Sequence, residues 1–324
     1  MKAMRVTKAG DPNVLQLEDI PQPKPGPGEA LVRVHVAGVN FADTYMRGGK
    51  VPAPVPFTSG IEGAGVVEAV GEGITDVKPG DRVAYAGRTL GSYAEYDVVK
   101  TSLLAPLPPQ VSFEDGAAII LQGLTAHYLL HEFYRIKRGS NVLVHAAAGG
   151  MGLLLTQWLK HMGAVAFGTV SSEEKAKLAR EAGADHVIIY TKQDFAEEVK
   201  KLTGGKGVDY IIDGVAKTTF TKNLDALAYR GWATVFGMSS GPADSVAPNS
   251  LMTKSLTISG GALFNYLTSR DELLMRANAV FAGLREGWLK LHIGGVFPLA
   301  QASEAHHRLE SRASTGKFIL KISP

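Results

Sequence analysis

Residues 141–160 constrain the fold of this chain more than any other stretch. The stretch reads Asn-Val-Leu-Val-His-Ala-Ala-Ala-Gly-Gly-Met-Gly-Leu-Leu-Leu-Thr-Gln-Trp-Leu-Lys. The apolar, β-branched run Val142–Val144 predicts a buried parallel strand. Glycines follow at Gly149, Gly150 and Gly152, and the apolar spacing after them predicts a helix. Strand, glycine-rich turn and helix in this order are typical of a dinucleotide-binding unit.

The glycine pattern departs from G-x-G-x-x-G at its first position, where Ala147 stands. We expect Gly149 to let the backbone approach a pyrophosphate and Gly152 to let the helix pack close to the strand. The helix N-terminus would offer its free N–H groups to the phosphates. One alternative is a glycine-loosened turn of another α/β protein. The other is a membrane span, since no acidic or basic residue interrupts Val142 to Leu159, but clustered glycines argue against it.

The whole chain has the composition of an ordinary globular protein, with 324 residues of which 45% are hydrophobic and 20% charged. This length predicts about two domains of roughly 150 residues each. The net charge of +3 comes from dispersed lysines and arginines, so nucleic acid is disfavoured as a main partner. The absence of cysteine excludes disulfides and cysteine-ligated zinc. The N-terminal residues show no apolar signal region, so we expect a cytoplasmic protein without a membrane span.

Up to about residue 121 the chain predicts a β-rich, barrel-like domain. Alternating apolar and polar residues mark strands at 5–7, 30–36, 65–70 and 82–85, with Gly and Pro between them.

From Gly123 onward strands and helices alternate, which predicts a doubly wound parallel sheet. After the first strand, further strands are predicted at 164–170, 186–190, 208–213, 232–236 and 256–259. The predicted helices are one from an N-cap at Ser171 or Ser172 to a C-terminal Gly183, then 195–202, one through Leu224 and Leu227, 270–286 and 300–312. A last strand at 318–322 is predicted to return to the first domain.

Six short motifs carry a resemblance to a known family. They are Gly38–Gly49, Gly60–Gly71, Gly80–Val83, Gly123–Ala126, Ala147–Gly152 and Leu309–Gly316. In order and spacing they resemble the quinone oxidoreductase (zeta-crystallin-like) family of the medium-chain dehydrogenase/reductase superfamily. The resemblance implies an α/β fold, with a GroES-like β-barrel domain (1–123 and 266–324) and a Rossmann doubly wound parallel sheet domain (124–265). It also implies metal-free, NADPH-dependent reduction of quinones.

The residues themselves favour the metal-free branch of that superfamily. Zinc alcohol dehydrogenases carry Cys and His ligands where this chain has Asn40 and the stretch Gly60-Ile61-Glu62. Asn40 and Ile61 are poor zinc ligands, so we expect no catalytic zinc. The one adjacent histidine pair, His306-His307, is predicted to lie on the surface of a charged helix.

The end of the second Rossmann strand favours NADPH over NADH. An NAD site usually has Asp or Glu there, whereas this strand ends in Thr169-Val170-Ser171-Ser172. Lys175 follows on the first helical turn, and hydroxyls, a cation and a helix N-terminus suit a 2′-phosphate. In the alternative interpretation Lys175 only faces solvent, and Glu173 and Glu174 repel phosphate.

The resemblance implies further cofactor contacts. These are Thr125 and Tyr128 at the nicotinamide, Gly150 and Met151 at the pyrophosphate, Tyr190 and Arg312 at the adenosine, and Gly237, Ser239, Ser240, Leu263 and Phe264 in later loops. For Leu263 and Phe264 core packing is an equal alternative, because Gly260-Gly261-Ala262 stands where the family often has bulkier residues. His145 is expected to be a hydrogen-bonded core histidine.

Hydride transfer to a conjugated carbonyl leaves negative charge on the acceptor oxygen, so a metal-free site needs hydrogen-bond donors. The candidates are Asn40 and Tyr45, and the Tyr45 phenol is also a possible proton donor. Asp43 and Arg47 are four residues apart and are predicted to form a structural ion pair on one helix.

Three functions stay open: quinone reduction, reduction of the C=C bond of 2-enals, enones or enoyl thioesters, and an RNA-binding or crystallin-type structural role. Gln122 and Val51 stand where relatives have Lys or Tyr, which weakens the inference to quinones. The β-branched Thr257 and Ile258 in the last Rossmann strand predict a homodimer through that sheet edge. The physiological acceptor and the number of electrons transferred are not determined by the sequence.

Overall fold

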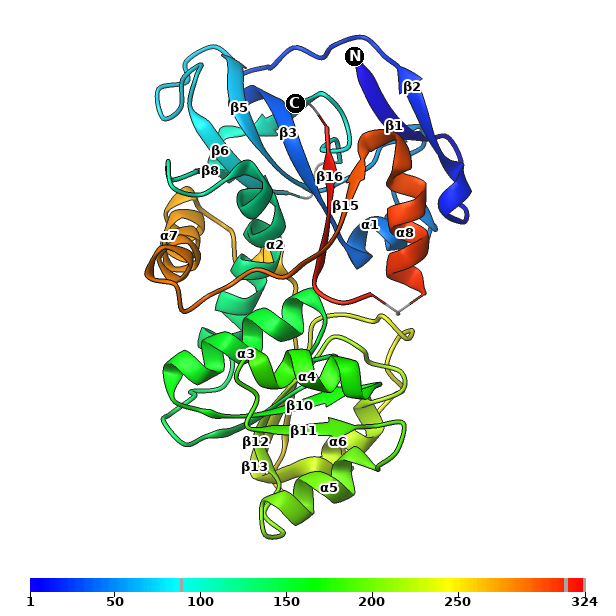
Figure 1. Cartoon of the computed structure of the whole chain (residues 1–324), viewed down its shortest axis with the longest axis vertical. Helices are drawn as coiled ribbons and strands as arrows, with labels where there is room; N and C mark the ends of the chain where they lie inside the picture. The colour runs from blue at the N-terminus through cyan, green and yellow to red at the C-terminus, as the bar shows by residue number, and fades with distance from the viewer. Residues whose placement is uncertain (88–89, 312–313, 323–324) are drawn as a thin grey trace. The chain divides into compact units, whose positions relative to one another are not determined.

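A computed structural model describes residues 1–87, 90–311 and 314–322 of the chain. The chain divides into two compact units (Figure 1). Unit 1 comprises Met1–Leu124, Leu267–Glu286 and Leu291–Pro324, and unit 2 comprises Thr125–Tyr266 and Gly287–Lys290. Residues 287–290 lie in unit 2, although the predicted first domain (1–123 and 266–324) includes them. The reason is Trp288, whose ring stacks on His161 with the centroids 4.1 Å apart.

Unit 1 is built on a three-stranded and a seven-stranded β-sheet. Its strands are β1 (Lys2–Val6), β2 (Leu15–Asp19), β3 (Glu29–Val39), β4 (Phe57–Thr58), β5 (Glu62–Val70), β6 (Arg82–Ala86), β7 (Tyr96–Lys100), β8 (Leu104–Pro106), β15 (Ile293–Pro298) and β16 (Lys317–Lys321). The small sheet has the order β2-β1-β4, and the large sheet has the order β15-β16-β3-β5-β6-β8, with β7 also paired to β3. The four strands predicted from alternation overlap β1, β3, β5 and β6.

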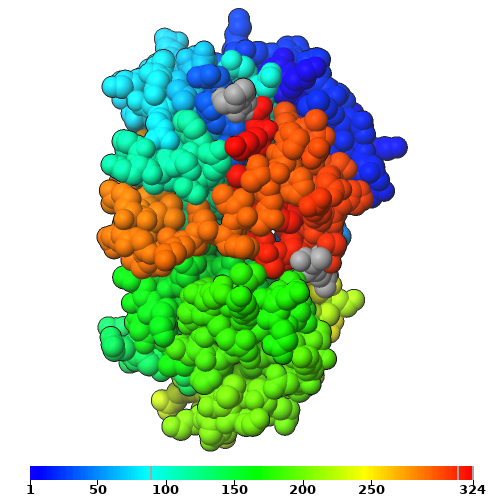
Figure 2. Space-filling model, viewed as in Figure 1, coloured from blue at the N-terminus to red at the C-terminus, as the bar shows by residue number. Residues whose placement is uncertain are grey.

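The last strand joins the two ends of the chain. β16 runs antiparallel to β3, with Phe318 opposite Val39 and Lys321 opposite Val36. Figure 1 shows the red β16 beside the blue β3. On the surface in Figure 2, orange and red C-terminal residues lie beside the blue N-terminal ones. The predicted return of this strand to the first domain is confirmed by the pairing.

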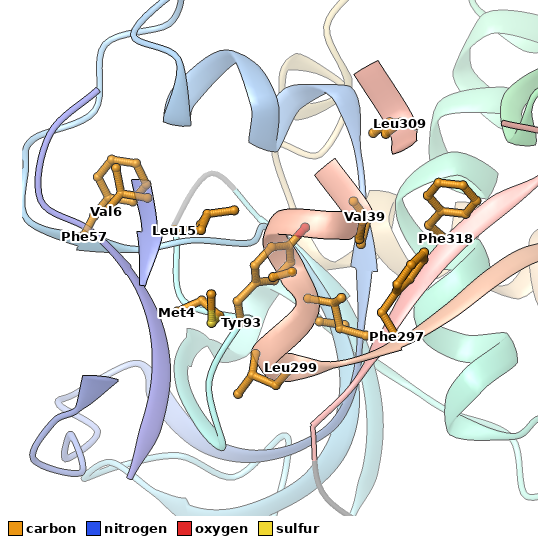
Figure 3. Packing of buried hydrophobic residues seen from close by; sticks show 14 residues of the cluster. Met4, Val6, Leu15, Val39, Phe57, Tyr93, Phe297, Leu299, Leu309 and Phe318 are labelled. Carbon is orange, nitrogen blue, oxygen red and sulfur yellow. The ribbon is translucent and has the colours of Figure 1, made fainter. Parts of the chain in front are cut away.

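One apolar core of unit 1 draws on both ends of the chain (Figure 3). Its large members are Met4, Val6, Leu15, Val39, Phe57, Tyr93, Phe297, Leu299, Leu309 and Phe318. Burying a side chain of this size contributes about 1.5–3 kcal/mol relative to leaving it in water. Tyr93 brings a hydroxyl group into this cluster, and a buried hydroxyl needs hydrogen-bond partners.

Among the described residues, the helices that lie wholly in unit 1 are α1 (Phe41–Arg47), α7 (Arg270–Glu286) and α8 (Ala302–Glu310). α7 has the predicted bounds, whereas α8 is shorter than the predicted helix at 300–312. A fourth helix, α2 (Phe113–His131), contains the division between the units and has no counterpart in the prediction, because its apolar residues form no one-sided stripe. Short 3₁₀ turns occur at Pro12–Val14, Thr101–Leu103, Pro248–Leu251, Leu263–Asn265 and Leu299–Gln301.

Unit 2 contains the predicted doubly wound sheet, with the strand order β11-β10-β9-β12-β13-β14 and only parallel pairings. The strands are β9 (Asn141–Val144), β10 (Val165–Val170), β11 (His186–Ile189), β12 (Val208–Asp213), β13 (Leu227–Val235) and β14 (Thr257–Gly260). The helices are α3 (Gly150–Met162), α4 (Glu173–Glu181), α5 (Phe195–Leu202) and α6 (Phe220–Ala226). Figure 1 shows α3 and α4 on one face of the sheet and α5 and α6 on the other.

The strand order reverses between β9 and β12, and ligands of such sheets bind at this switch point, beyond the carboxyl ends of the strands. The boundary between α6 and β13 was predicted wrongly. The helix was expected to run through Leu227 and end before Gly231, with the strand from Trp232, whereas Leu227 begins β13 opposite Val208. The reason is a close backbone approach, since a Cβ atom on Gly207 would lie only 2.7 Å from the carbonyl carbon of Leu227. Within the described ranges, no helix is both long enough and apolar enough to cross a membrane.

Candidate active site

The glycine-rich turn between β9 and α3 has the predicted packing. Gly149 is the N-cap of α3, and a Cβ atom on Gly152 would overlap the carbonyl oxygen of Ala146 and lie 2.5 Å from the Cα of Ala147. Gly152 therefore lets α3 pack directly on the turn. Ala147, in place of the first glycine, is fully buried, and Gly168 on β10 makes room for its methyl group. Ala146 supplies the left-handed backbone, with φ of 53°.

The turn after β10 is built as a helix N-terminus that can hold an anion. Ser172 is the N-cap of α4, and its Oγ accepts a hydrogen bond from the N–H of Lys175 at 3.3 Å. Burial lowers the pKa of the half-buried Lys175 from its usual value, and a bound anion would oppose that shift. Glu173 is exposed and its carboxylate lies 3.0 Å from Lys192 Nζ, which offsets its repulsion of a phosphate.

The other predicted cofactor residues of unit 2 follow the carboxyl ends of its strands. Gly149–Gly152 follow β9, Ser171, Ser172 and Lys175 follow β10, Tyr190 follows β11, Gly237, Ser239 and Ser240 follow β13, and Leu263 and Phe264 follow β14. Because the strands are parallel, these positions share one edge of the sheet. Thr125 and Tyr128 lie on α2, and Arg312 is outside the described residues.

The loops after β12 and β13 are tied to each other. The N–H groups of Ser239 and Ser240 donate to the carbonyl oxygens of Gly214 and Val215 at 3.1 and 3.0 Å. The Ser240 hydroxyl donates to Val215 O at 2.7 Å and accepts from Thr218 N at 3.1 Å. Ser240 thus links two loops at the ligand-binding edge, a task that its sequence context does not reveal.

Tyr128 and the small residues after β14 form one packed group. Tyr128 is buried, its ring stacks on Tyr266 with the centroids 4.6 Å apart, and burial raises its pKa above the usual value. A Cβ atom on Gly261 would lie 2.8 Å from the rings of both Tyr128 and Phe133. Gly261 therefore leaves space for two aromatic rings, and Leu263, 7% exposed, packs in the interior.

His145, at the carboxyl end of β9, is confirmed as a hydrogen-bonded core residue. Its Nδ1 lies 2.9 Å from Thr169 Oγ1 and its Nε2 lies 2.7 Å from Asn223 Oδ1. Asn223 in turn donates from Nδ2 to Asp213 Oδ2 at 2.7 Å. Asn223 Oδ1 is therefore an acceptor, so His145 donates from Nε2 and accepts from the threonine hydroxyl.

In unit 1, the candidate donor Asn40 is engaged at both ends of its side-chain amide. Asn40 Oδ1 accepts from Lys317 Nζ at 2.6 Å, and Asn40 Nδ2 donates to Glu62 Oε2 at 2.8 Å. Lys317 Nζ also donates to Glu62 Oε2 at 2.6 Å, which closes a buried triangle. Lys317 was missed by the sequence reasoning; the available signal was a basic residue at the start of an apolar strand.

Asp43 is fully buried beside this triangle. Its Oδ2 accepts from the backbone N–H of Asn40 at 2.8 Å and from the Tyr93 hydroxyl at 3.1 Å. Burial raises the pKa of Asp43 to about 7, against the lowering effects of the Asn40 N–H and of Lys317.

The predicted ion pair of Asp43 with Arg47 is wrong. Arg47 instead donates two hydrogen bonds to Glu310 on α8, at 3.1 and 2.8 Å. It also donates from NH1 to His306 Nδ1 at 3.2 Å. Tertiary packing of α8 on α1 gives Arg47 these partners, so the i,i+4 spacing does not decide its pairing.

His306 is fully buried, so its predicted surface position is also wrong. It belongs to the buried stripe of α8, with Ala302, Ala305 and Leu309, and that spacing is a signal that could have placed it. Since arginine can only donate, His306 Nδ1 accepts and Nε2 donates to the Tyr93 oxygen at 3.2 Å. Burial, followed by the charge of Arg47, lowers the pKa of His306 to about 3.

Tyr45, the second candidate donor, is half-buried on α1, with its ring centroid 6.3 Å from that of Phe41. The backbone N–H of Val51 donates to Tyr45 O at 3.1 Å, so these two residues are neighbours. Gln122 has a buried Oε1 for which the described residues offer no hydrogen-bond partner. These are the positions at which we expect the substrate pocket to be reshaped.

Comparison with known proteins decides the family. Residues 26–109 match the alcohol dehydrogenase GroES-like domain, and residues 150–277 match the zinc-binding dehydrogenase family. A quinone oxidoreductase of Pseudomonas aeruginosa is 42% identical over 98% of this chain and 99% of its own length. Quinone oxidoreductase 1 of Escherichia coli is 41% identical over 97% of both chains. The chain belongs to the quinone oxidoreductase family.

Solved structures agree with this family. The Escherichia coli quinone oxidoreductase complexed with NADPH has a TM-score of 0.96 and 40% identity, over 99% of this chain and 100% of that one. The predicted fold class, a GroES-like domain plus a Rossmann domain, is therefore confirmed. A 2-haloacrylate reductase of Burkholderia sp is also similar, at 40% identity over 97% of each chain.

Asn40 and the stretch Gly60–Glu62 are the positions that we expected to replace the ligands of zinc alcohol dehydrogenases. Across the described ranges, no three His, Asp or Glu side chains are grouped so that they could hold a metal ion. Asn40 and Glu62 instead bind the ammonium group of Lys317. The oxygen atoms of Asn40 and Glu62 therefore bind the ammonium group of a lysine of this chain.

Proposed function

We propose that this protein is an NADPH-dependent quinone reductase. The observation that carries the proposal is the turn after β10, in which Ser171, Ser172 and Lys175 stand at a helix N-terminus without a carboxylate at the strand end. This donor set suits a 2′-phosphate better than a ribose hydroxyl. The Escherichia coli relative complexed with NADPH supports the same cofactor.

Each part of the cofactor has proposed contacts in the chain. Lys175, Ser171 and Ser172 bind the 2′-phosphate, the turn at Gly149–Gly152 binds the pyrophosphate with its N–H groups, and Tyr190 contacts the adenosine. Thr125, Tyr128, Gly237, Ser239, Ser240, Leu263 and Phe264 complete the cradle. When bound, NADPH supplies the hydride for the reduction.

The acceptor side of the reaction is assigned to unit 1. We place the phenol of Tyr45 as the hydrogen-bond and proton donor to the acceptor oxygen, where negative charge collects during hydride transfer. Asn40 supports this donor at the start of α1, because its own amide is already bonded to Lys317 and Glu62. Much of the remaining rate enhancement comes from holding the reactants close together.

A panel of acceptors tests the proposal directly. Oxidation of NADPH is measured against ortho- and para-quinones, 2-alkenals and an enoyl thioester, and each reaction is repeated with NADH. We expect turnover of quinones with NADPH and much weaker turnover with NADH. No NADPH oxidation with any quinone would refute the proposal.

Reduction of a C=C bond is the second candidate function. The similar 2-haloacrylate reductase favours it, since its name describes reduction of an unsaturated acid derivative. Val51 and Gln122 are the pocket positions that would decide between the acceptors. Faster turnover of the alkenals or the thioester than of any quinone would establish this alternative.

A homodimer through the edge of the unit 2 sheet is also proposed. β14 ends the strand order, and its Ile258 is half-buried rather than covered. Large apolar side chains are exposed in the same part of the chain, with Tyr229 77% and Met252 74% exposed. A monomeric mass by light scattering would exclude the dimer.

We also propose a cytoplasmic location, where an NADPH-dependent reductase finds its cofactor, and cell fractionation tests it.

A further inference from the structure

We propose that Lys317 is a positioning residue for the reduction: its buried ammonium group fixes the amide of Asn40 and thereby the first turn of α1, which carries Tyr45. The inference rests on the proposed function, because it assigns to Lys317 an effect on turnover. It concerns a residue of the last strand, 277 positions away from Asn40 in the sequence.

The ammonium group determines which way the Asn40 amide points. A lysine ammonium only donates, so the Asn40 atom at 2.6 Å from Lys317 Nζ must be the oxygen. The amide nitrogen then faces the Glu62 carboxylate at 2.8 Å, where it can donate. In the opposite orientation the amide nitrogen would face the ammonium group, donor against donor. The amide oxygen would then face the carboxylate, acceptor against acceptor.

Asn40 is held in this way in addition to its place at the N-cap of α1. It forms a capping box with Asp43, and the hydrogen bond from Lys317 Nζ to its side-chain oxygen is 2.6 Å long. Asp43 secures the helix start by accepting from the Asn40 N–H at 2.8 Å. Asn40 is therefore fixed on its backbone by Asp43 and at both ends of its side-chain amide, and Tyr45 follows within the same helix.

The surroundings are shaped to hold the charged pair. Glu62 Oε1 accepts from the backbone N–H of Leu121 at 2.7 Å, so both carboxylate oxygens are bonded. A Cβ atom on Gly38 would overlap the Glu62 carboxylate, so only glycine leaves room for it. The side chains of Lys317 and Glu62 are 1% and 0% exposed.

Stability alone does not explain such a pair. Burying two charges costs desolvation energy, and apolar residues of similar volume often serve as well or better. What apolar residues cannot do is orient the polar amide of Asn40. The geometry therefore assigns the pair to positioning of the Asn40 helix.

The experiment compares Lys317→Met, Glu62→Gln and the double variant carrying both changes. The double variant removes the charge pair without leaving either charge alone. Lys321→Met is the matched control, since this lysine lies on the same strand but is exposed, 3.2 Å from Glu114. Melting temperature, the Kd of NADPH, kcat and the KM of the quinone are measured for each.

We expect the folded double variant to lose about 10–100-fold in kcat, as for a catalytic group displaced by about an ångström. Its NADPH Kd and quinone KM should stay within about twofold, and Lys321→Met should match the wild type. A folded double variant with the kcat of the wild type would overturn the inference.

A second measurement decides the question if the variants do not fold. In an atomic-resolution crystal structure of the wild-type protein with NADPH, the oxygen and nitrogen of the Asn40 amide can be told apart. Asn40 Oδ1 facing Lys317 supports the inference, and an amide turned away from Lys317 overturns it. Absence of quinone turnover by the wild type refutes the proposed function, a result distinct from either outcome for Lys317.

Discussion

The carboxyl edge of the unit 2 sheet and the buried polar cluster of unit 1 are assembled in opposite ways. At the sheet edge, Ser171, Ser172 and Lys175 lie within five consecutive residues, and the N-cap bond spans three positions. In unit 1, Lys317 meets Glu62 across 255 positions and Arg47 meets Glu310 across 263. A site built from neighbours in sequence can be predicted locally, whereas a site built by chain topology cannot.

The largest expected effect tests the long-range cluster. Glu62→Leu leaves the Lys317 ammonium buried without its carboxylate, and removing one partner of such a pair costs about 3–5 kcal/mol of unfolding free energy. Glu114→Leu, which removes the exposed partner of Lys321, should change stability by less than about 1 kcal/mol. Urea denaturation measures both. Equal losses would mean that burial is not what distinguishes the two pairs.

Asp97 extends the test to pH. This carboxyl is buried and accepts from the Tyr85 hydroxyl at 2.9 Å, and burial raises its pKa to about 7. An acid whose pKa is raised on folding stabilises the protein fully below about pH 4, and that contribution is lost as the pH rises through about 7. The loss amounts to at most about 4 kcal/mol.

Asp97→Asn should therefore change the unfolding free energy less unfavourably between about pH 4 and pH 7 than the wild type does. Asp43, whose pKa is raised to about 7, and His306, whose pKa is lowered to about 3 and which acts in the opposite direction, contribute alike to both proteins. Denaturation curves at a series of pH values check this. Identical pH profiles for variant and wild type would contradict the assignment.

Lys175→Ala tests the locally built site. We expect NADPH binding to weaken by about 1.5–3 kcal/mol, the value of a charge-assisted hydrogen bond, while NADH binding stays nearly unchanged. Lys177→Ala is the control, because this lysine lies on the same helix but is exposed and pairs with Glu181. Calorimetric titration with both cofactors measures the difference. Equal losses for NADPH and NADH would remove the case for a phosphate contact.

The smallest effect concerns the altered glycine turn. Ala146 adopts a left-handed backbone, which disfavours residues with a Cβ atom. Ala146→Gly should raise the unfolding free energy by up to about 1 kcal/mol, since relief of strain is partly offset by the entropy of glycine. Thermal denaturation can resolve this change, and a clear loss of stability would show that the alanine is not strained.

Much of the fold follows from local patterns. The bounds of α5, β12 and α7 agree with the prediction, because their apolar periodicity and end signals lie within each segment. The boundary at Leu227 was missed because it depends on the close approach of the Gly207 backbone to the backbone of Leu227. The apolar spacing of the segment does not reveal that approach.

The candidate site divides along the same line. The sequence by itself determined the doubly wound sheet, the glycine turn and the helix start after β10 that we propose as the phosphate site, since each depends on residues a few positions apart. Only the tertiary structure decided the partner of Arg47, the burial of His306 and the contact of Lys317 with Asn40. The physical reason is that hydrogen bonds and ion pairs form between groups that meet in space. Here the pairing of β16 with β3 and the packing of α8 on α1 choose those groups.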